Sequence, residues 1–195
     1  MLAWSGGTPI ALAAVAKVPE LFHAYIAMAQ ITRQRESERI ASDYMLKWLT
    51  EQNDQRSLKQ LKKYRDLETE SDLISFFNSG TRDNLMHKIG IGTMRSMKSV
   101  FREVFVSVWT CRAYTLREKF NIWISKFSFV SKTGLRSQII NLDIPADIPG
   151  IEIPVYSFSG KYDLTVNKDL ANEYQEKLQA PIKGFYTLTN RLIVR

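Results

Sequence analysis

Histidine and cysteine are scarce in this chain, which has two histidines and one cysteine among 195 residues. Cys111 has no second cysteine for a disulfide and no neighbouring Cys or His at the spacing of a metal site. No stretch reaches the roughly 20 apolar residues that cross a bilayer, and no basic segment precedes the first apolar run. We therefore expect no metal, no cofactor, no membrane association and no signal peptide, and by default a cytoplasmic location.

The remaining composition is that of a globular protein. Hydrophobic residues make up 45% and charged residues 24% of the chain, which suits one domain with or without an insertion. The net charge of +7 permits an acidic partner, but the basic residues are scattered along segments with a helical pattern. Solvated helix faces explain that spread, so we expect no nucleic-acid partner. The oligomeric state does not follow from the sequence.

The pattern of apolar residues changes twice along the chain. Residues 8–18 predict a short helix and residues 24–29 a buried parallel strand. The middle of the chain predicts helices at 33–52, 54–65, 69–80, 97–112 and 116–130. Three prolines and a glycine at 143–154 exclude regular helix there. The last part predicts a strand, a helix and a strand at 153–158, 167–178 and 184–189.

These segments predict the α/β class. Residues 1–30 and 137–195 would form one sheet of parallel strands with flanking helices, and residues 31–136 an all-helical cap inserted between them. A complete doubly wound parallel sheet buries both faces, so a sheet without its first strands is expected to have uncovered apolar surface. The first strand would have only residues 1–3, shorter than usual, so we expect missing strands upstream, an open sheet edge and a chain prone to aggregate.

Ser5 is followed by two glycines and then by the predicted helix at 8–18. The run Ala3-Trp4-Ser5-Gly6-Gly7 is a variant of the G-x-S-x-G pattern of a nucleophile elbow, where a strand turns sharply into a helix. Small residues at Ala3 and Gly7 would allow close packing of helix on strand, and the Gly6 N–H would face an oxyanion. The alternative is a serine that caps a helix.

Asp163 follows the predicted strand 153–158 in the short loop Ser159-Gly160-Lys161-Tyr162-Asp163. A catalytic triad needs an acid on such a loop, where it orients a histidine ring and stabilises its charged form. Open α/β sheets bind ligands at the carboxyl ends of their strands, so we expect Ser5 and Asp163 to meet at one edge. The alternative is an ordinary turn aspartate.

Further segments fit one pattern around these two residues. They are Pro19-Glu20-Leu21-Phe22-His23-Ala24-Tyr25, Ala29-Gln30, Tyr114-Thr115-Leu116-Arg117-Glu118-Lys119, Ile153-Pro154-Val155-Tyr156, Gly160-Lys161-Tyr162-Asp163, Glu173-Tyr174 and Ala180-Pro181-Ile182-Lys183. Together they resemble the capped, proline-iminopeptidase-like members of the α/β-hydrolase superfamily over nearly the whole chain. The resemblance implies a hydrolase of a small amide or ester, such as an N-terminal peptide bond, with Ser5 as nucleophile, Gly6 as oxyanion donor and Asp163 as acid.

The chain departs from this family in two ways. Family members have a long segment ahead of the nucleophile, which supplies a second oxyanion N–H. Their histidine follows the last strand, and an ungapped alignment puts that position at Ile193, within a terminal segment, 191–195, unlike the family sequence. We therefore expect a truncated and inactive form of a serine hydrolase.

Both histidines of the chain precede Asp163. We interpret His23 as an ordinary partly buried histidine and His87 as a surface or packing residue. The pair Gly90 and Gly92 lacks the strand context and the third glycine of a nucleotide-binding loop. Glu36 and Glu38 are candidates for binding a substrate amine, and the alternative is that both are surface residues of a solvated helix.

Two functions stay open from the sequence. The first is the serine hydrolase, acting on a small-molecule or peptide substrate. The second is a non-catalytic helical interaction protein, whose functional parts would be its amphipathic helices and basic surface. A buried parallel sheet with Ser5 and Asp163 at one edge favours the first, and an independent helical bundle favours the second.

Overall fold

Four parallel strands form one sheet in the order in which they occur along the chain. A computed structural model describes residues 1–64, 69–92, 97, 101–125, 128 and 132–189. The strands are β1 (Leu2–Trp4), β2 (Tyr25–Met28), β3 (Val155–Gly160) and β4 (Lys183–Leu188). In the register, Ala27 of β2 lies opposite Ala3 of β1 and Ser157 of β3. The predicted α/β class with a parallel sheet and flanking helices is confirmed.

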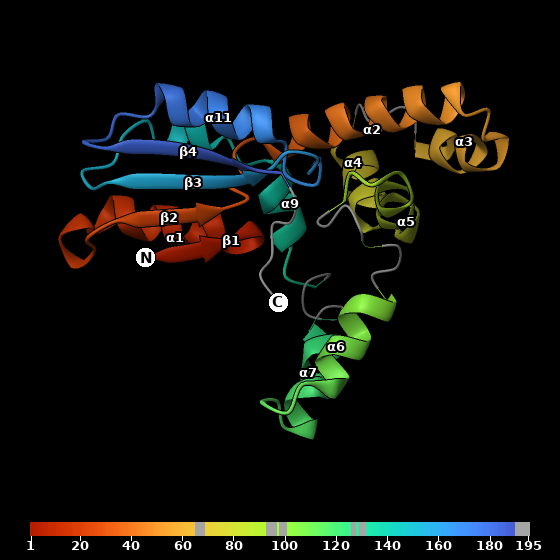
Figure 1. Ribbon diagram of the computed structural model, residues 1–195, viewed down its shortest axis with the longest axis horizontal. Coiled ribbons are helices and arrows are strands. Elements are labelled where there is room, and N and C mark those ends of the chain that lie inside the picture. The colour runs from red at the N-terminus through yellow and green to blue at the C-terminus, as the bar shows by residue number, and fades with distance from the viewer. Residues whose placement is uncertain (65–68, 93–96, 98–100, 126–127, 129–131, 190–195) are drawn as a thin grey trace.

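One face of the sheet is covered by helices (Figure 1). The covering elements are α1 (Thr8–Lys17), the one-turn α10 (Ile144–Asp147) and α11 (Lys168–Lys177), and the short 3-10 helix η2 (Pro19–Leu21) lies between α1 and β2. Side chains from these helices and from alternate strand positions form one buried cluster, which includes Ala3, Leu12, Val15, Tyr25, Ala27, Ile144, Val155, Tyr174 and Leu178. Because strand side chains alternate between faces, the other strand positions point away from this cluster.

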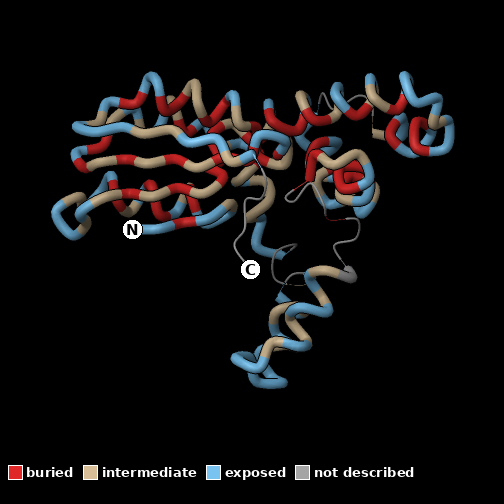
Figure 2. Tube along the Cα trace, in the orientation of Figure 1, coloured by how far each residue is buried: buried red, intermediate tan, exposed pale blue. Residues whose placement is uncertain are grey.

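The opposite face of the sheet is less covered (Figure 2). Leu2 and Trp4 are 64% and 47% exposed, and Tyr186 is 48% exposed with its ring stacked 4.9 Å from that of Phe158. The alternating residues Ile26, Met28, Tyr156 and Phe158 are half-buried, and none of them belongs to a buried cluster of the described chain. For the residues described, this exposure agrees with the uncovered apolar surface expected of a sheet without its first strands. We call this surface, made of Leu2, Trp4, Ile26, Met28, Tyr156, Phe158 and Tyr186, the open face.

The described residues of 34–64 and 69–89 form helices with a hydrophobic core of their own. The elements are α2 (Gln34–Glu51), α3 (Gln55–Leu61), the 3-10 helix η3 (Lys62–Tyr64), α4 (Glu70–Asn78) and α5 (Gly80–Ile89). Their buried cluster includes Met45, Leu49, Leu61, Leu73, Phe76 and Met86, and Ile140 of α9 (Leu135–Ile140) joins it. The boundary predicted between residues 136 and 137 falls within α9.

A helical arm extends away from these two parts (Figure 1). It consists of the π-helical turn η4 (Phe101–Phe105), α6 (Val106–Thr110) and α7 (Leu116–Ile124), and neither α6 nor α7 has a buried residue. Ring contacts join Phe105 to Trp109 and Trp123, and Trp109 to Phe120. Parts of the helices predicted at 97–112 and 116–130 lie outside the described residues. Of the helices in the described ranges, none is long and apolar enough to cross a membrane.

Two predictions differ from the structure in detail. The helix predicted at 69–80 is α4, which ends at Asn78, near Gly80 as expected, but Gly80 does not close this helix and is instead the first residue of α5. Ser79 is extended and caps α5 by accepting a hydrogen bond from the Arg82 N–H at 3.2 Å. The segment 143–154 holds one helical turn, α10, because Pro145 lies in its first turn, where no N–H is needed.

Candidate functional site

Ser5 lies at the turn between β1 and α1, where the backbone is strained. β1 ends at the extended residue Trp4, and Ser5 begins the 3-10 turn η1 (Ser5–Gly7) with a φ of 48°. A positive φ is unfavourable for a residue with a Cβ and persists only where the surroundings hold it. The sharp strand-to-helix turn predicted at Ser5 is therefore confirmed. The serine is half-buried at the carboxyl end of β1, and its role as a nucleophile stays a prediction.

Thr8 holds this turn from the first residue of α1. Its hydroxyl donates to the Ser5 carbonyl at 2.6 Å and accepts from the Ile31 N–H at 3.1 Å. The Thr8 carbonyl lies 3.1 Å from the buried Tyr25 hydroxyl, which is also 2.7 Å from Gln30 Oε1. Burial raises the pKa of Tyr25, so its phenol stays protonated and can donate. The turn after β1 is thus tied to both ends of β2.

The two glycines after Ser5 leave the outer side of the turn open. A Cβ added to Gly6 or Gly7 would meet no atom within 4 Å, and Gly7 has a φ of −81°, which any residue adopts. The expectation that packing requires a small residue at Gly7 is wrong, because Gly7 is exposed and has open space on its Cβ side. The Gly6 N–H lies in the first turn, where backbone donors lack an intrahelical partner. It stays the predicted oxyanion donor.

Asp163 lies three residues beyond the end of β3 and is 5% exposed. Its Oδ1 accepts hydrogen bonds from the backbone N–H groups of Thr165 at 2.8 Å and Val166 at 3.3 Å. Burial raises the pKa of Asp163 to about 6, although these hydrogen bonds and the charge of Arg82 lower it. The hydrogen bonds are those of a turn aspartate. A buried carboxyl with a raised pKa is, in addition, a candidate functional group.

Ser5 and Asp163 both follow the carboxyl ends of parallel strands. Ser5 follows β1, Asp163 follows β3, and β2 lies between these strands. Neighbouring strands lie about 4.8 Å apart, so the two strand ends are roughly 10 Å apart. That separation leaves room for an imidazole ring between a serine and an acid. In the part of the chain that the structure describes, no hydrogen bond joins the two residues directly.

Three buried polar side chains, Gln34, Glu38 and Arg82, connect α2 and α5 to the loop of Asp163. Gln34 Nε2 donates to Glu38 Oε1 at 2.7 Å and to the Thr165 carbonyl at 3.0 Å. Glu38 is fully buried, and Arg82 donates to both of its oxygens, from Nε at 2.6 Å and from Nη2 at 2.5 Å. The interpretation of Glu38 as a surface residue is therefore wrong, because its charge is neutralised by a buried arginine. Glu36 is exposed, as expected for a surface residue.

His23 is placed away from Ser5. It lies just before β2, at the amino edge of the sheet, whereas Ser5 lies at the carboxyl edge. Since β2 has four residues, the two edges are about 13 Å apart. His23 is exposed, so the interpretation of a partly buried histidine is wrong: it stands in the connection ahead of the strand and not in the sheet.

His87 is a buried packing residue of α5. It is 5% exposed, and a Cβ added to Gly92 would lie 2.5 Å from ring atoms of His87. Burial lowers the pKa of His87, so its ring is neutral at pH 7. Gly90 ends α5 in the left-handed conformation with a φ of 75°. Packing and helix capping thus account for both glycines without a bound nucleotide.

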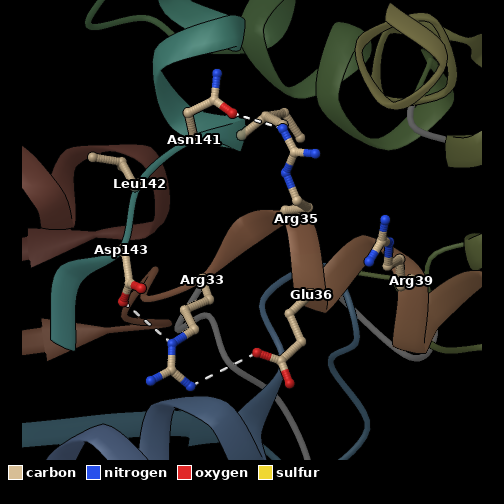
Figure 3. Close-up of a pocket in the computed structure, with 8 residues that line it drawn as sticks. Arg33, Arg35, Glu36, Arg39, Asn141, Leu142 and Asp143 are labelled. Atoms are coloured by element: carbon tan, nitrogen blue, oxygen red, sulfur yellow. Dashed lines mark hydrogen bonds and ion pairs between the residues drawn. The ribbon is translucent and has the colours of Figure 1, made fainter. Parts of the chain in front are cut away.

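No metal site is formed by the described residues, since no group of three or more His, Cys, Asp or Glu side chains could hold an ion there. A groove of about 550 Å³ lies beside the start of α2 (Figure 3). Its lining residues are Arg33, Arg35, Glu36, Arg39, Ile140, Asn141, Leu142 and Asp143. Arg33 Nε donates to Asp143 at 3.2 Å and Nη1 lies 3.7 Å from Glu36, and Arg35 Nη2 donates to Asn141 at 2.7 Å. None of the predicted catalytic residues lines this groove.

Three residues that hold the site were not predicted from the sequence: Thr8, Gln34 and Arg82. Gln34 and Glu38 are four positions apart on one predicted helix, so their contact was within reach of a spacing argument. Arg82 follows Glu38 by 44 positions, and no local pattern encodes that pairing.

Comparison with known proteins gives distant matches. No family model matches the chain. The chain is 24% identical over 196 aligned residues to the probable aminopeptidase YbaC of Bacillus subtilis, an alignment that covers 95% of this chain and 56% of that protein. Among solved structures, Rv0554 from Mycobacterium tuberculosis matches with a TM-score of 0.46 and 17% identity over 97% of this chain and 56% of that one. The chain thus spans about half the length of these proteins, and it is a distant relative of a probable bacterial aminopeptidase.

Proposed function

We propose that this chain carries the nucleophile and the acid of an α/β-hydrolase-type serine hydrolase, Ser5 and Asp163. The observation that carries the proposal is the φ of 48° at Ser5, directly after a parallel strand and ahead of a helix. In a nucleophile elbow this strain lifts the serine Oγ above the carboxyl edge of the sheet. The distant relationship to a probable aminopeptidase supports the same assignment.

The proposed substrate is a small amide or ester, with an N-terminal peptide bond as the first choice. The name of the Bacillus relative supports a peptide substrate. We assign residues 1–30 and 137–195 to the hydrolase core and residues 31–136 to a cap at its carboxyl edge. The separate hydrophobic cluster of α2, α3, α4 and α5 supports that division.

The proposed chemistry follows from the placement of three residues. Ser5 Oγ would attack the substrate carbonyl while its proton passes to an imidazole, and the Gly6 N–H would stabilise the resulting oxyanion. The C–N or C–O bond would then break, the leaving amine or alcohol would take up that proton, and water would hydrolyse the acyl-enzyme. Asp163 would orient an imidazole and stabilise its charged form, an interaction strengthened by the burial of the carboxyl. No cofactor or metal takes part in this scheme.

The chain itself does not supply that imidazole. His23 lies at the opposite edge of the sheet, His87 is packed against Gly92, and no histidine follows Asp163. Without a general base, serine hydrolases of this mechanism lose on the order of a millionfold in turnover. We therefore propose that the chain as given is inactive, and that Ile193 is the residue that aligns with the base of the family.

Replacing Ile193 with histidine tests the proposal. The variant Ile193→His should react at Ser5 with a fluorophosphonate probe, whereas the parent chain should not. The double variants Ile193→His/Ser5→Ala and Ile193→His/Asp163→Asn serve as controls, and the second should lower the labelling rate by up to about 10⁴-fold. A folded Ile193→His variant that remains unlabelled would contradict the roles given to Ser5 and Asp163.

The alternative of a non-catalytic interaction protein has one specific observation in its favour. Leu116, Phe120 and Ile124 of α7 are 68%, 55% and 61% exposed and lie four positions apart, so they form an apolar stripe on the arm. A pull-down in which Phe120→Glu abolishes capture of a defined partner would support that function. The stripe does not account for the strained serine.

A further inference from the structure

The loop that carries Asp163 is attached at three points to the helical segment, which we define as α2, α3, α4, α5 and Ile91. The Leu164 N–H donates to the Ile91 carbonyl at 2.9 Å, and the Thr165 carbonyl accepts from Gln34 Nε2 at 3.0 Å. The Asn167 N–H donates to Ser37 Oγ at 3.0 Å. The Leu164 side chain also packs against the hydrophobic cluster of the helical segment. Three of the four residues that follow Asp163 are thus held by residues more than 70 positions away in the sequence.

The two α2 residues that hold the loop are themselves fixed. Gln34 and Ser37 are 2% and 3% exposed on the first turn of α2. The Gln34 side chain also donates to Glu38, whose two oxygens accept from Arg82. A fully buried ion pair with two hydrogen bonds has little freedom to move, because breaking it leaves an unpaired buried charge. The Gln34 amide is therefore held on one side by this pair and donates to the loop on the other.

The same loop residues set the position of the Asp163 carboxyl. Thr165, whose carbonyl accepts from Gln34, donates its N–H to Asp163 Oδ1 at 2.8 Å. Val166, between Thr165 and the attached Asn167, also donates to Oδ1. A shift of this backbone would move the N–H groups of Thr165 and Val166 together. The hydrogen bonds of the loop to Gln34 and Ser37 on α2 therefore fix the position of the Asp163 carboxyl.

We propose that Gln34 and Ser37 are positioning residues for Asp163, so that α2 acts as a clamp on the acid loop and not only as part of the proposed cap. The proposal rests on the role proposed for Asp163. If α2 holds the acid loop, the helical segment has to stay in contact with that loop through Gln34 and Ser37. Any opening of a cap would then have to occur elsewhere, for instance at the arm formed by η4, α6 and α7.

Amide hydrogen exchange of the intact chain tests the clamp. We expect Gln34→Met, which removes the donor but keeps the length of the side chain, to accelerate exchange at Thr165 and Val166 by about tenfold, as expected for the loss of one hydrogen bond. Ser37→Ala should have a similar effect, centred on Asn167. Exchange at Ser157 and Phe158 in β3 serves as the internal reference and should change less than twofold.

A matched control variant is offered by another polar contact of the helical segment. Asp54 accepts hydrogen bonds from Lys88 and from the Ser57 N–H, far from the loop in sequence. Asp54→Asn should leave exchange at Thr165, Val166 and Asn167 unchanged. Acceleration confined to the loop in Gln34→Met and Ser37→Ala, and absent in Asp54→Asn, is the result that the clamp predicts.

A spectroscopic readout separates positioning from general support. Burial raises the pKa of Asp163 to about 6, and the charged side chain that acts on it is Arg82, which pairs with Glu38 and Asp83. Loosening the loop lets water reach the carboxyl, so its titration midpoint, followed by the ¹³C shift of the carboxyl carbon, should move down toward the ordinary range near 4 in Gln34→Met. Asp54→Asn should leave the midpoint in place.

Two outcomes would overturn the clamp. One is unchanged loop exchange together with an unchanged Asp163 midpoint in both variants. The other is acceleration in β3 equal to that in the loop, which shows a loss of global stability only. Should Gln34→Met fail to fold, Ser37→Ala decides alone, because it removes a single acceptor. Fluorophosphonate labelling of Ile193→His reports on the proposed function separately, so either idea can fail without the other.

Discussion

The two faces of the sheet differ in how the chain covers them. On the covered face, Leu12 and Val15 of α1 pack on Tyr25 and Ala27, and all four are fully buried. On the open face, Leu2, Trp4 and Tyr186 expose about half or more of their surface. Both faces consist of apolar side chains from the same short strands. The strand sequences therefore do not decide which face is buried, and the helices packed against the sheet do.

The contrast extends to the candidate site. The strained turn at Ser5 is held from the covered side, by Thr8 of α1 and by the hydroxyl of Tyr25. The outer side of the same turn is open around Gly6 and Gly7. The loop of Asp163 is held by Gln34 of α2 and by Ile91, which follows α5. The turn of Ser5 and the loop of Asp163 are thus held by different parts of the chain, the first by α1 and β2 and the second by α2 and Ile91.

The largest expected effect is a difference in the free energy of unfolding between the same substitution on the covered face and on the open face. Leu12→Ala should lower the free energy of unfolding by about 2–5 kcal/mol, since it leaves a cavity between α1 and the sheet. Leu2→Ala, the same change on the open face, should cost less than about 0.5 kcal/mol. Urea unfolding followed by circular dichroism measures both. Equal losses in the two variants would show that Leu2 is buried in solution and that the faces do not differ.

A smaller effect is the pH dependence of the free energy of unfolding that comes from Asp163 at the carboxyl edge of the sheet. The pKa of Asp163 is raised to about 6 in the folded chain and is about 4 when unfolded, so the folded state binds the proton more tightly. The free energy of unfolding should therefore rise as the pH falls from 7 toward 4.5, by on the order of 2 kcal/mol from this group. Asp163→Asn should be more stable than the parent at pH 7.5 and lose this part of the pH dependence. A variant that keeps the full pH dependence would assign it to other groups.

The smallest expected change in the free energy of unfolding is that of Trp4→Lys. This substitution should nevertheless change the self-association of the chain. Trp4→Lys adds a charge to the open face beside the edge strand β1 and should reduce self-association, because a charged edge discourages pairing with another chain. Its free energy of unfolding should stay within about 0.5 kcal/mol of the parent. Ile10→Lys, at a residue 69% exposed on α1, is the matched control. Sedimentation velocity at several concentrations distinguishes the two, and equal behaviour would rule out the open face as the associating surface.

The order and type of the main elements could be predicted because each has a local pattern. The apolar run at 24–29 predicts β2 (Tyr25–Met28), and the helical pattern at 33–52 predicts α2 (Gln34–Glu51) to within one residue at each end. The turn at Ser5 was predictable for the same reason, since small residues follow a serine ahead of a helix. The start of α5 was not, because Gly80 suits a helix end as well as a helix start, and the cap at Ser79 decides between them.

Burial across the fold could not be predicted from local patterns. Glu38 has the sequence context of a solvated glutamate, and its burial depends on Arg82 from another helix. The open face has the same apolar residues as a covered one, and only the placement of α1, α10 and α11 shows which face is buried. The chemical roles of Ser5, Gly6 and Asp163 stay predictions, because geometry alone does not show reactivity.

The most direct test of the central claim, that Ser5 is a nucleophile in an elbow without its base, is the stoichiometry of fluorophosphonate labelling measured by intact-protein mass spectrometry. We predict no labelling of the parent chain above that of Ser5→Ala, and labelling of Ile193→His that disappears when Ser5→Ala is added. Stoichiometric labelling of the parent chain at Ser5 would contradict the account, because it would show that another group already serves as the base.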